Sequence, residues 1–226
     1  MNIKLNYIET GSGDVPILLH CNGEESGYFT HQIEYFSAKR RVIAVDTRGH
    51  GKSPRGTAPF TIKQFAIDLC SFMDSLNIEN ADILGFSDGA NIAAEFAIKY
   101  PHRVSRLILN GGNLNPDGVK RMVQLPIEAG YWFASKFADK SPEAKRNAEM
   151  MGLMVNEPNL SPEDISCIKT KTLVIAGTRD MIKNKHTKLI ADSLPNSQLK
   201  FIKGDHFIAN KRHETFNIAV EKFLEE

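Results

Sequence analysis

The chain has 226 residues, of which 42% are hydrophobic and 24% charged, with a formal net charge of +1. This composition is typical of a globular protein with one substantial core, and the near-neutral charge gives no electrostatic basis for binding nucleic acid or an anionic membrane. No apolar run approaches a membrane span, the N-terminus lacks a signal-peptide core, and the three cysteines are scattered. We therefore expect a cytoplasmic protein with free thiols.

Strand and helix patterns alternate along most of the chain. Short apolar stretches bounded by turn residues predict strands at residues 3–8, 15–19, 41–45, 81–86, 104–109, 172–176 and 198–202. Helical patterns lie between them, at residues 28–38, after a cap at Thr61, from residue 90 to Pro101, at 185–194 and in an amphipathic C-terminal segment. This alternation predicts an α/β fold with a mostly parallel central sheet and helices on both faces.

Residues 113–166 interrupt this alternation. They show no strand pattern, and prolines divide them into what we expect to be short helical pieces, at positions 116, 126, 142, 158 and 162. We therefore predict a single domain over residues 1–226 with a small helical cap inserted at about 113–166.

The segment Gly85-Phe86-Ser87-Asp88-Gly89 lies between a predicted strand and a predicted helix. This Gly-x-Ser-x-Gly pattern in a strand–turn–helix context is that of a nucleophile elbow, in which a serine stands on a tight, strained turn. Glycines two places before and after the serine remove Cβ atoms that would clash where the chain passes close to itself. The pattern predicts Ser87 as a nucleophile above the N-terminus of the next helix.

A serine hydroxyl needs a base within hydrogen-bond reach and an acid that orients the base. Of the seven histidines, His206 follows the last predicted strand, so its loop can carry it over the sheet edge. Asp180 also ends a loop just after a strand, whereas Asp205 adjoins His206 and Asp117 is a weaker alternative in the cap. In a parallel sheet, ligand sites lie beyond the carboxyl ends of the strands, so we predict that Ser87, Asp180 and His206 form a triad there.

The oxyanion of an acyl-transfer reaction requires preorganised donors. One is expected to be the backbone N–H of Asp88, at the start of the elbow helix. The second is expected from the loop that follows the strand at residues 15–19, where Asn22 is the best candidate and Cys21 the second.

Taken together, five motifs resemble those of the α/β-hydrolase superfamily, in the branch of small bacterial serine hydrolases and esterases. They are His20-Cys21-Asn22-Gly23, the Asp46–Ser53 turn, the Gly85–Gly89 elbow, Gly177-Thr178-Arg179-Asp180 and Gly204-Asp205-His206. The resemblance runs nearly end to end and implies the hydrolase fold and the same triad. One departure is Cys21, because the family usually has glycine after the oxyanion-loop histidine.

The Ser-Asp-Gly sequence of the elbow is similar to that of valacyclovir hydrolase, an amino-acid ester hydrolase in which the aspartate attracts the substrate's amino group. By this resemblance, Asp88 could pair with an ammonium. The alternative is that Asp88 only favours the N-terminus of its helix. Aromatic residues near the site, among them Tyr131, Trp132 and Phe207, are candidates for an apolar substrate pocket.

These observations predict a serine hydrolase that cleaves a small carboxylic ester or related acyl substrate through an acyl-enzyme. A carbon–carbon bond hydrolase or a thioesterase would use the same triad, and a ligand-binding protein on the same fold would show little or no turnover. No His/Cys cluster has zinc-ligand spacing and no Gly-x-Gly-x-x-Gly opens a helix, so we expect neither metal nor cofactor. The sequence leaves the oligomeric state open.

Overall fold

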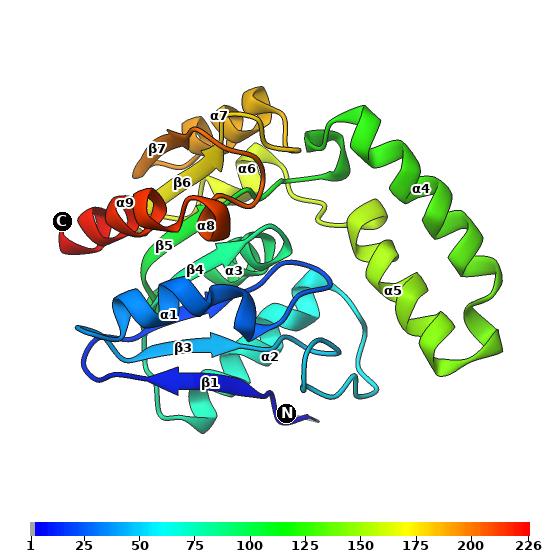
Figure 1. The fold of residues 1–226 in the computed structure, drawn as a ribbon, viewed down its shortest axis with the longest axis horizontal. Coiled ribbons are helices and arrows are strands. Elements are labelled where there is room, and N and C mark those ends of the chain that lie inside the picture. The colour runs from blue at the N-terminus through cyan, green and yellow to red at the C-terminus, as the bar shows by residue number, and fades with distance from the viewer. Residues whose placement is uncertain (1–2) are drawn as a thin grey trace.

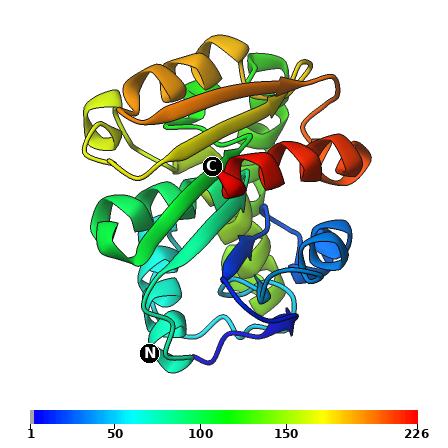
Figure 2. The same cartoon turned by 90° about the vertical axis from the view of Figure 1, so that its left-hand side faces the viewer.

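The computed structural model describes residues 3–226, which form a seven-stranded sheet in the order β1-β3-β2-β4-β5-β6-β7. The strands are β1 (Tyr7–Thr10), β2 (Pro16–Leu19), β3 (Val42–Val45), β4 (Ala81–Phe86), β5 (Val104–Asn110), β6 (Thr172–Gly177) and β7 (Ser197–Ile202). Only β1 is antiparallel to its neighbour β3, and every other pair is parallel. Figure 2 shows the twisted strands fanning from β7 at the top to β1 at the bottom. The structure therefore confirms the predicted α/β class.

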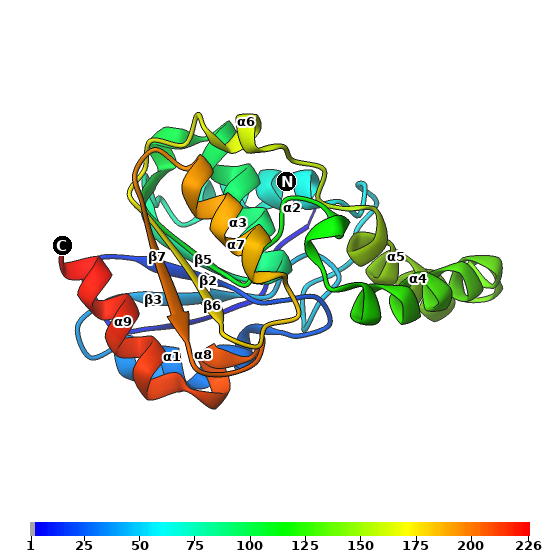
Figure 3. The same ribbon diagram turned by 90° about the horizontal axis from the view of Figure 1, so that it is seen from above.

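Helices cover both faces of the sheet (Figures 1 and 3). One face carries α2 (Ile62–Ser75), α3 (Asp88–Lys99) and α7 (Asn184–Ser193), and the other carries α1 (Thr30–Phe36), α8 (Ile208–Lys211) and α9 (His213–Glu225). Because β-strand side chains alternate between faces, each face has its own hydrophobic core, with Ile83 in the first and Leu84 in the second. The Thr61 hydroxyl accepts a hydrogen bond from the Gln64 N–H, which confirms the predicted cap of α2.

The first strand starts later than its pattern predicts. Residues 3–8 alternate, yet β1 begins at Tyr7 because Asn6 is engaged elsewhere. The Asn6 N–H donates to Ser53 Oγ at 2.8 Å and its side-chain amide donates to Asp46 at 2.8 Å. The chain before β1 is thus held by the turn that follows β3 rather than by the sheet ladder.

The prediction of short helical pieces in residues 113–166 is wrong. The segment forms two long antiparallel helices, α4 (Arg121–Lys136) and α5 (Pro142–Asn156), followed by the short α6 (Pro162–Ile165). Pro142 and Pro162 begin helices, where a missing N–H costs nothing. Pro126 lies inside α4, on its solvent-exposed side, so water can satisfy the carbonyl that its missing N–H leaves unpaired. The α4–α5 hairpin stands beyond the carboxyl ends of the parallel strands, at the right of Figure 1.

Candidate active site

Ser87 occupies the turn between β4 and α3, with backbone angles of φ 55° and ψ −117°. A positive φ is strained for any residue but glycine, and such strain is characteristic of functional turns. The Ser87 N–H donates to the Asn110 carbonyl at 2.8 Å, which fixes the turn to the end of the neighbouring strand β5. The serine is thereby held at the N-cap of α3, immediately before the helix begins.

The two elbow glycines allow the close approaches that hold this turn. A Cβ atom at Gly85 would lie 2.1 Å from the Gly89 carbonyl oxygen, and one at Gly89 would lie 2.0 Å from the Leu19 carbonyl oxygen. No side chain fits at these separations. Because Gly89 lies so close to the Leu19 carbonyl, the end of β2 and the start of the loop at residues 20–22 lie against the start of α3.

Asp180 and His206 come from the loops after β6 and β7 and meet in the interior. His206 Nδ1 lies 2.7 Å from Asp180 Oδ1, and both side chains are buried. Asp180 is oriented by two backbone donors, the N–H of Ile182 at 2.9 Å and the N–H of Gly177 at 3.4 Å. Because the carboxylate accepts the proton on Nδ1, the histidine presents Nε2 as its basic nitrogen.

The histidine lies beside the elbow. Its ring is 4.8 Å, centroid to centroid, from the ring of Phe86, the residue before Ser87. A Cβ atom at Gly111 would be 3.0 Å from His206 Cε1, and Gly111 follows Asn110, whose carbonyl holds the Ser87 N–H. The structure therefore brings all three predicted triad residues to one short stretch of the sheet edge.

The loop after β2 is fixed by its histidine. His20 Nε2 accepts from the Thr47 N–H at 3.0 Å, so its proton is on Nδ1, which donates to the Cys21 carbonyl at 2.7 Å. Burial lowers the pKa of His20, which keeps the ring neutral. In a trans peptide the N–H points opposite to the C=O. Pinning the Cys21 carbonyl therefore also fixes the direction of the Asn22 N–H.

Cys21 itself packs into the core rather than into open space. Its side chain is buried in the same hydrophobic cluster as Tyr28 and Phe86. Burial, with the nearby charges of Glu24 and Asp88, raises the pKa of its thiol well above the usual range, so the sulfur stays protonated. The residue that replaces the family's glycine thus behaves as a small apolar side chain.

Asp88, next to the nucleophile, is an unusual carboxylate. It is nine-tenths buried, and one oxygen, Oδ2, has no hydrogen-bond partner among residues 3–226. Its other oxygen accepts a 3.4 Å bond from the Asn91 side chain. Burial raises the pKa of Asp88 to about 6, the charge of Glu157 acts in the same direction, and the amides of Asn22 and Asn91 act against it.

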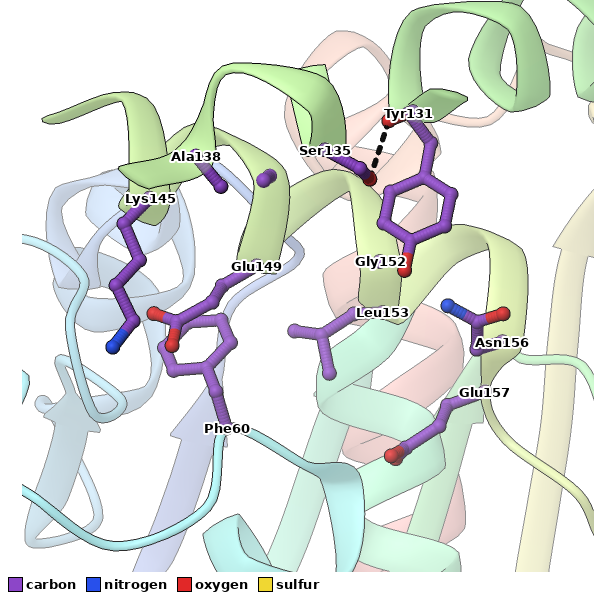
Figure 4. A pocket seen from close by; sticks show the side chains of 11 residues that line it. Phe60, Tyr131, Ser135, Ala138, Lys145, Glu149, Gly152, Leu153, Asn156 and Glu157 are labelled. Atoms are coloured by element: carbon purple, nitrogen blue, oxygen red, sulfur yellow. Dashed lines mark hydrogen bonds between the residues drawn. The ribbon is translucent and has the colours of Figure 1, made fainter. Parts of the chain in front are cut away.

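A pocket of about 400 Å³ lies between the α4–α5 hairpin and the body. In Figure 4, Tyr131 comes from α4, Leu153 and Glu157 from the end of α5, and Phe60 from the loop before α2. The Glu157 carboxylate in this pocket accepts from the Ile62 N–H, at the start of α2, at 2.6 Å. Of these four residues, the sequence predicts only Tyr131 as a pocket residue.

The other two predicted pocket residues lie in different surroundings. The Phe207 ring is 5.6 Å from the His206 ring, and it lines a second pocket of about 430 Å³ with Tyr28 and Glu24. Trp132 is 61% exposed, and the Lys136 ammonium lies 3.4 Å from the centre of its ring. Trp132 is therefore on the outer side of α4, and this position gives no support to a role in the substrate pocket.

The described part of the chain has no group of three or more His, Cys, Asp or Glu side chains arranged to hold a metal ion. Within residues 3–226, no helix combines the length and the apolar composition needed to cross a bilayer.

Comparisons with known proteins agree on one family. The family model described as "alpha/beta hydrolase fold" matches residues 17–150. The chain is 28% identical to 3-oxoadipate enol-lactonase 2 of Acinetobacter baylyi, over 99% of this chain and 94% of that protein. It is 30% identical to the 2-hydroxy-6-oxononadienedioate/2-hydroxy-6-oxononatrienedioate hydrolase of Paraburkholderia phymatum, over 84% of this chain and 66% of that protein. An enol-lactonase structure from Burkholderia xenovorans superposes with a TM-score of 0.81 at 22% identity, covering 99% of this chain and 97% of that one.

Proposed function

Because the chain belongs to the α/β-hydrolase fold family, we propose that it is a serine hydrolase that cleaves a small carboxylic ester, lactone or related acyl compound. The observation that supports this most strongly is the buried 2.7 Å contact between His206 and Asp180 beside the strained Ser87 turn. A base oriented by a carboxylate next to a serine on an elbow is the arrangement that activates a hydroxyl for acyl transfer.

In the first half-reaction, Ser87 Oγ attacks the substrate carbonyl and His206 Nε2 takes the hydroxyl proton. Asp180 stabilises the imidazolium that forms. The tetrahedral intermediate collapses, the bond to the leaving oxygen breaks, and His206 returns the proton to that oxygen. The acyl group is then an ester of Ser87.

In the second half-reaction, a water molecule gives its proton to His206 as it attacks the acyl-enzyme. Collapse of this second intermediate releases the carboxylic acid and restores the Ser87 hydroxyl. In both halves, the backbone N–H groups of Asp88 and Asn22 stabilise the negative oxygen. The fixed Cys21–Asn22 peptide supports this assignment, as does the close approach of the Leu19 and His20 carbonyls to Gly89 at the start of α3.

The pocket under the hairpin supports a substrate of modest size. Its volume of about 400 Å³ falls at the lower end of the range of small-molecule sites. Phe60, Tyr131 and Leu153 offer apolar surface there, and Asn156 and Glu157 offer polar groups. We assign the apolar part of the substrate to this pocket.

A panel of four acyl substrates tests the reaction class. Steady-state hydrolysis is measured for a p-nitrophenyl ester, a γ-lactone, a thioester and a vinylogous diketone of matched chain length, with wild type and Ser87→Ala. The proposal predicts oxygen-ester or lactone turnover that Ser87→Ala lowers at least 10³-fold. Preferred cleavage of the diketone would reassign the chain to carbon–carbon bond hydrolysis, and single-turnover acylation without steady-state turnover would reassign it to ligand binding.

A further inference from the structure

The outer side of α4 exposes a continuous apolar surface. Met122 is 89% exposed, Leu125 46%, Trp132 61% and Phe133 60%. At 3.6 residues per turn these positions fall on one side of the helix. We call this surface the α4 face; it consists of Met122, Leu125, Pro126, Ala129, Trp132, Phe133 and Lys136.

The α4 face has no partner within residues 3–226. The opposite side of the helix packs on α5, where Gly130 adjoins Met151 and Gln124 donates to the Met154 carbonyl at 3.1 Å. Figures 1 and 3 show the hairpin standing clear of the sheet, with α4 extending away from it. The exposed apolar side chains are therefore not the lining of the substrate pocket, which lies on the α5 side.

The size and composition of this surface are those of a protein interface. The four large side chains together expose on the order of 500 Å² of apolar area. A specific interface buries about 800 Å² per partner, which the rest of the helix and its flanks can complete. Trp, Phe and Met are enriched at interface centres and Lys is depleted, and the α4 face has one lysine against four large apolar residues.

The α4 face is also self-complementary about its centre. Leu125 and Phe133 each lie four residues from Ala129, Pro126 and Trp132 each lie three residues from it, and Met122 and Lys136 each lie seven residues from it. With a two-fold axis at Ala129, Leu125 of one copy faces Phe133 of the other. Pro126 then faces Trp132, and Met122 faces Lys136. The small alanine at the crossing lets the two backbones approach closely.

We propose that the α4 face binds a second copy of this chain, with the two α4 helices antiparallel and crossing at Ala129. An isologous contact of this kind closes on itself and gives a dimer rather than a filament. Because the hairpin projects from the body, two copies can meet through it without collision of their sheets. The dimer would cover the outer side of the cap in each copy and leave the active-site side unchanged.

A lipid surface is a poorer match to the α4 face. Helices that lie in a membrane interface present Lys and Arg along their polar side. The sequence of α4 contains two cations, Arg121 and Lys136, and Arg121 is paired with Glu128 at 2.8 Å. Only Lys136 stands on the apolar surface, and its ammonium is over the Trp132 ring.

Sedimentation velocity and tryptophan fluorescence across a dilution series test the proposal, and Trp132 is the only tryptophan in the chain. We expect the sedimenting mass to double with concentration and the Trp132 emission to move to shorter wavelength over the same range. Phe133→Glu should raise the dissociation constant at least 30-fold, as loss of an interface hot spot does. Ile218→Glu, an equally exposed apolar position on α9, should change it less than twofold.

Cross-linking tests the register. In a Cys167→Ser background, which removes the exposed native thiol, Ala129→Cys should form a disulfide between copies, whereas Ile218→Cys should not. A chain that stays monomeric at all concentrations overturns the proposal, and a Trp132 shift seen only with phosphatidylglycerol vesicles would assign the α4 face to lipid. A dimer that survives Phe133→Glu overturns it equally, because another surface must then hold the copies together.

Discussion

Replacing Asp180 with asparagine tests the orientation of the proposed base. Asp180 Oδ1 accepts from both His206 Nδ1 and the Ile182 N–H, and Oδ2 accepts from the Gly177 N–H. An asparagine that keeps its oxygen toward His206 places its NH₂ group against the Gly177 N–H, so two donors face each other. The flipped amide donates to His206 Nδ1 and moves the ring proton to Nε2, where it blocks proton transfer from Ser87.

Either orientation also leaves the imidazolium of the transition state without its carboxylate. In serine hydrolases this substitution costs about 10⁴-fold in turnover, which corresponds to about 5 kcal/mol of transition-state stabilisation. We expect Asp180→Asn to lower kcat for ester hydrolysis by about that factor. KM should change little, because Asp180 is fully buried and does not line the pocket.

Asp205 provides the matched control. It precedes His206, its side chain is 44% exposed, and it is paired with Lys211 rather than with the histidine. Asp205→Asn should change kcat less than threefold, and urea unfolding should show that both variants are folded at the assay temperature. A loss at Asp205→Asn that exceeds the loss at Asp180→Asn would refute the assignment of the acid.

Three further substitutions test other parts of the account. Gly89→Ala has no room for its Cβ against the Leu19 carbonyl, so urea unfolding should show a loss of about 3 kcal/mol or more, and wild-type stability would contradict the close approach. Arg48→Met takes the guanidinium away from the buried Asp68 carboxylate, which keeps the Gln64 amide as a donor, so we expect a loss of about 3–5 kcal/mol, to be compared with the double variant that also removes Asp68. Asp88 has a folded pKa of about 6, above its usual value, so its ionisation lowers stability as pH rises from about 4 to 6, by up to about 3 kcal/mol. If ionised Asp88 attracts a substrate ammonium, the preference for aminoacyl over plain acyl esters should rise through about pH 6 in wild type and be flat in Asp88→Asn; equal profiles would exclude that role.

Local sequence patterns were sufficient for the parallel strands of the sheet, but not for the antiparallel β1. The apolar run at residues 81–86 matches β4 residue for residue, because a buried parallel strand needs continuous apolar side chains. The same patterns do not predict the hairpin, because proline at a helical position is expected to break the helix. Whether Pro126 breaks a helix depends on whether water reaches the freed carbonyl, and this follows from how α4 packs rather than from its sequence.

At the site, too, local patterns predict the residues that follow strands but not those whose positions depend on how helices pack. Ser87, Asp180 and His206 could be placed together because each follows a parallel strand, and the carboxyl ends of such strands share one edge. Glu157 and Phe60 could not be found in this way, since they enter the pocket from the end of α5 and from the loop before α2. Trp132 was assigned to the pocket on residue type alone, and the rotation of α4 about its axis places it outside.

The central claim is that Ser87 is an activated nucleophile, and labelling with a fluorophosphonate probe tests it most directly. Wild type and Ser87→Ala are treated with the probe across a pH series, and the adduct is located by mass mapping. We expect an adduct on Ser87 that is absent from Ser87→Ala, and a labelling rate that falls at acid pH, as general-base activation of a serine requires. Folded wild-type protein that takes no label, or that takes it equally in Ser87→Ala, would contradict the account.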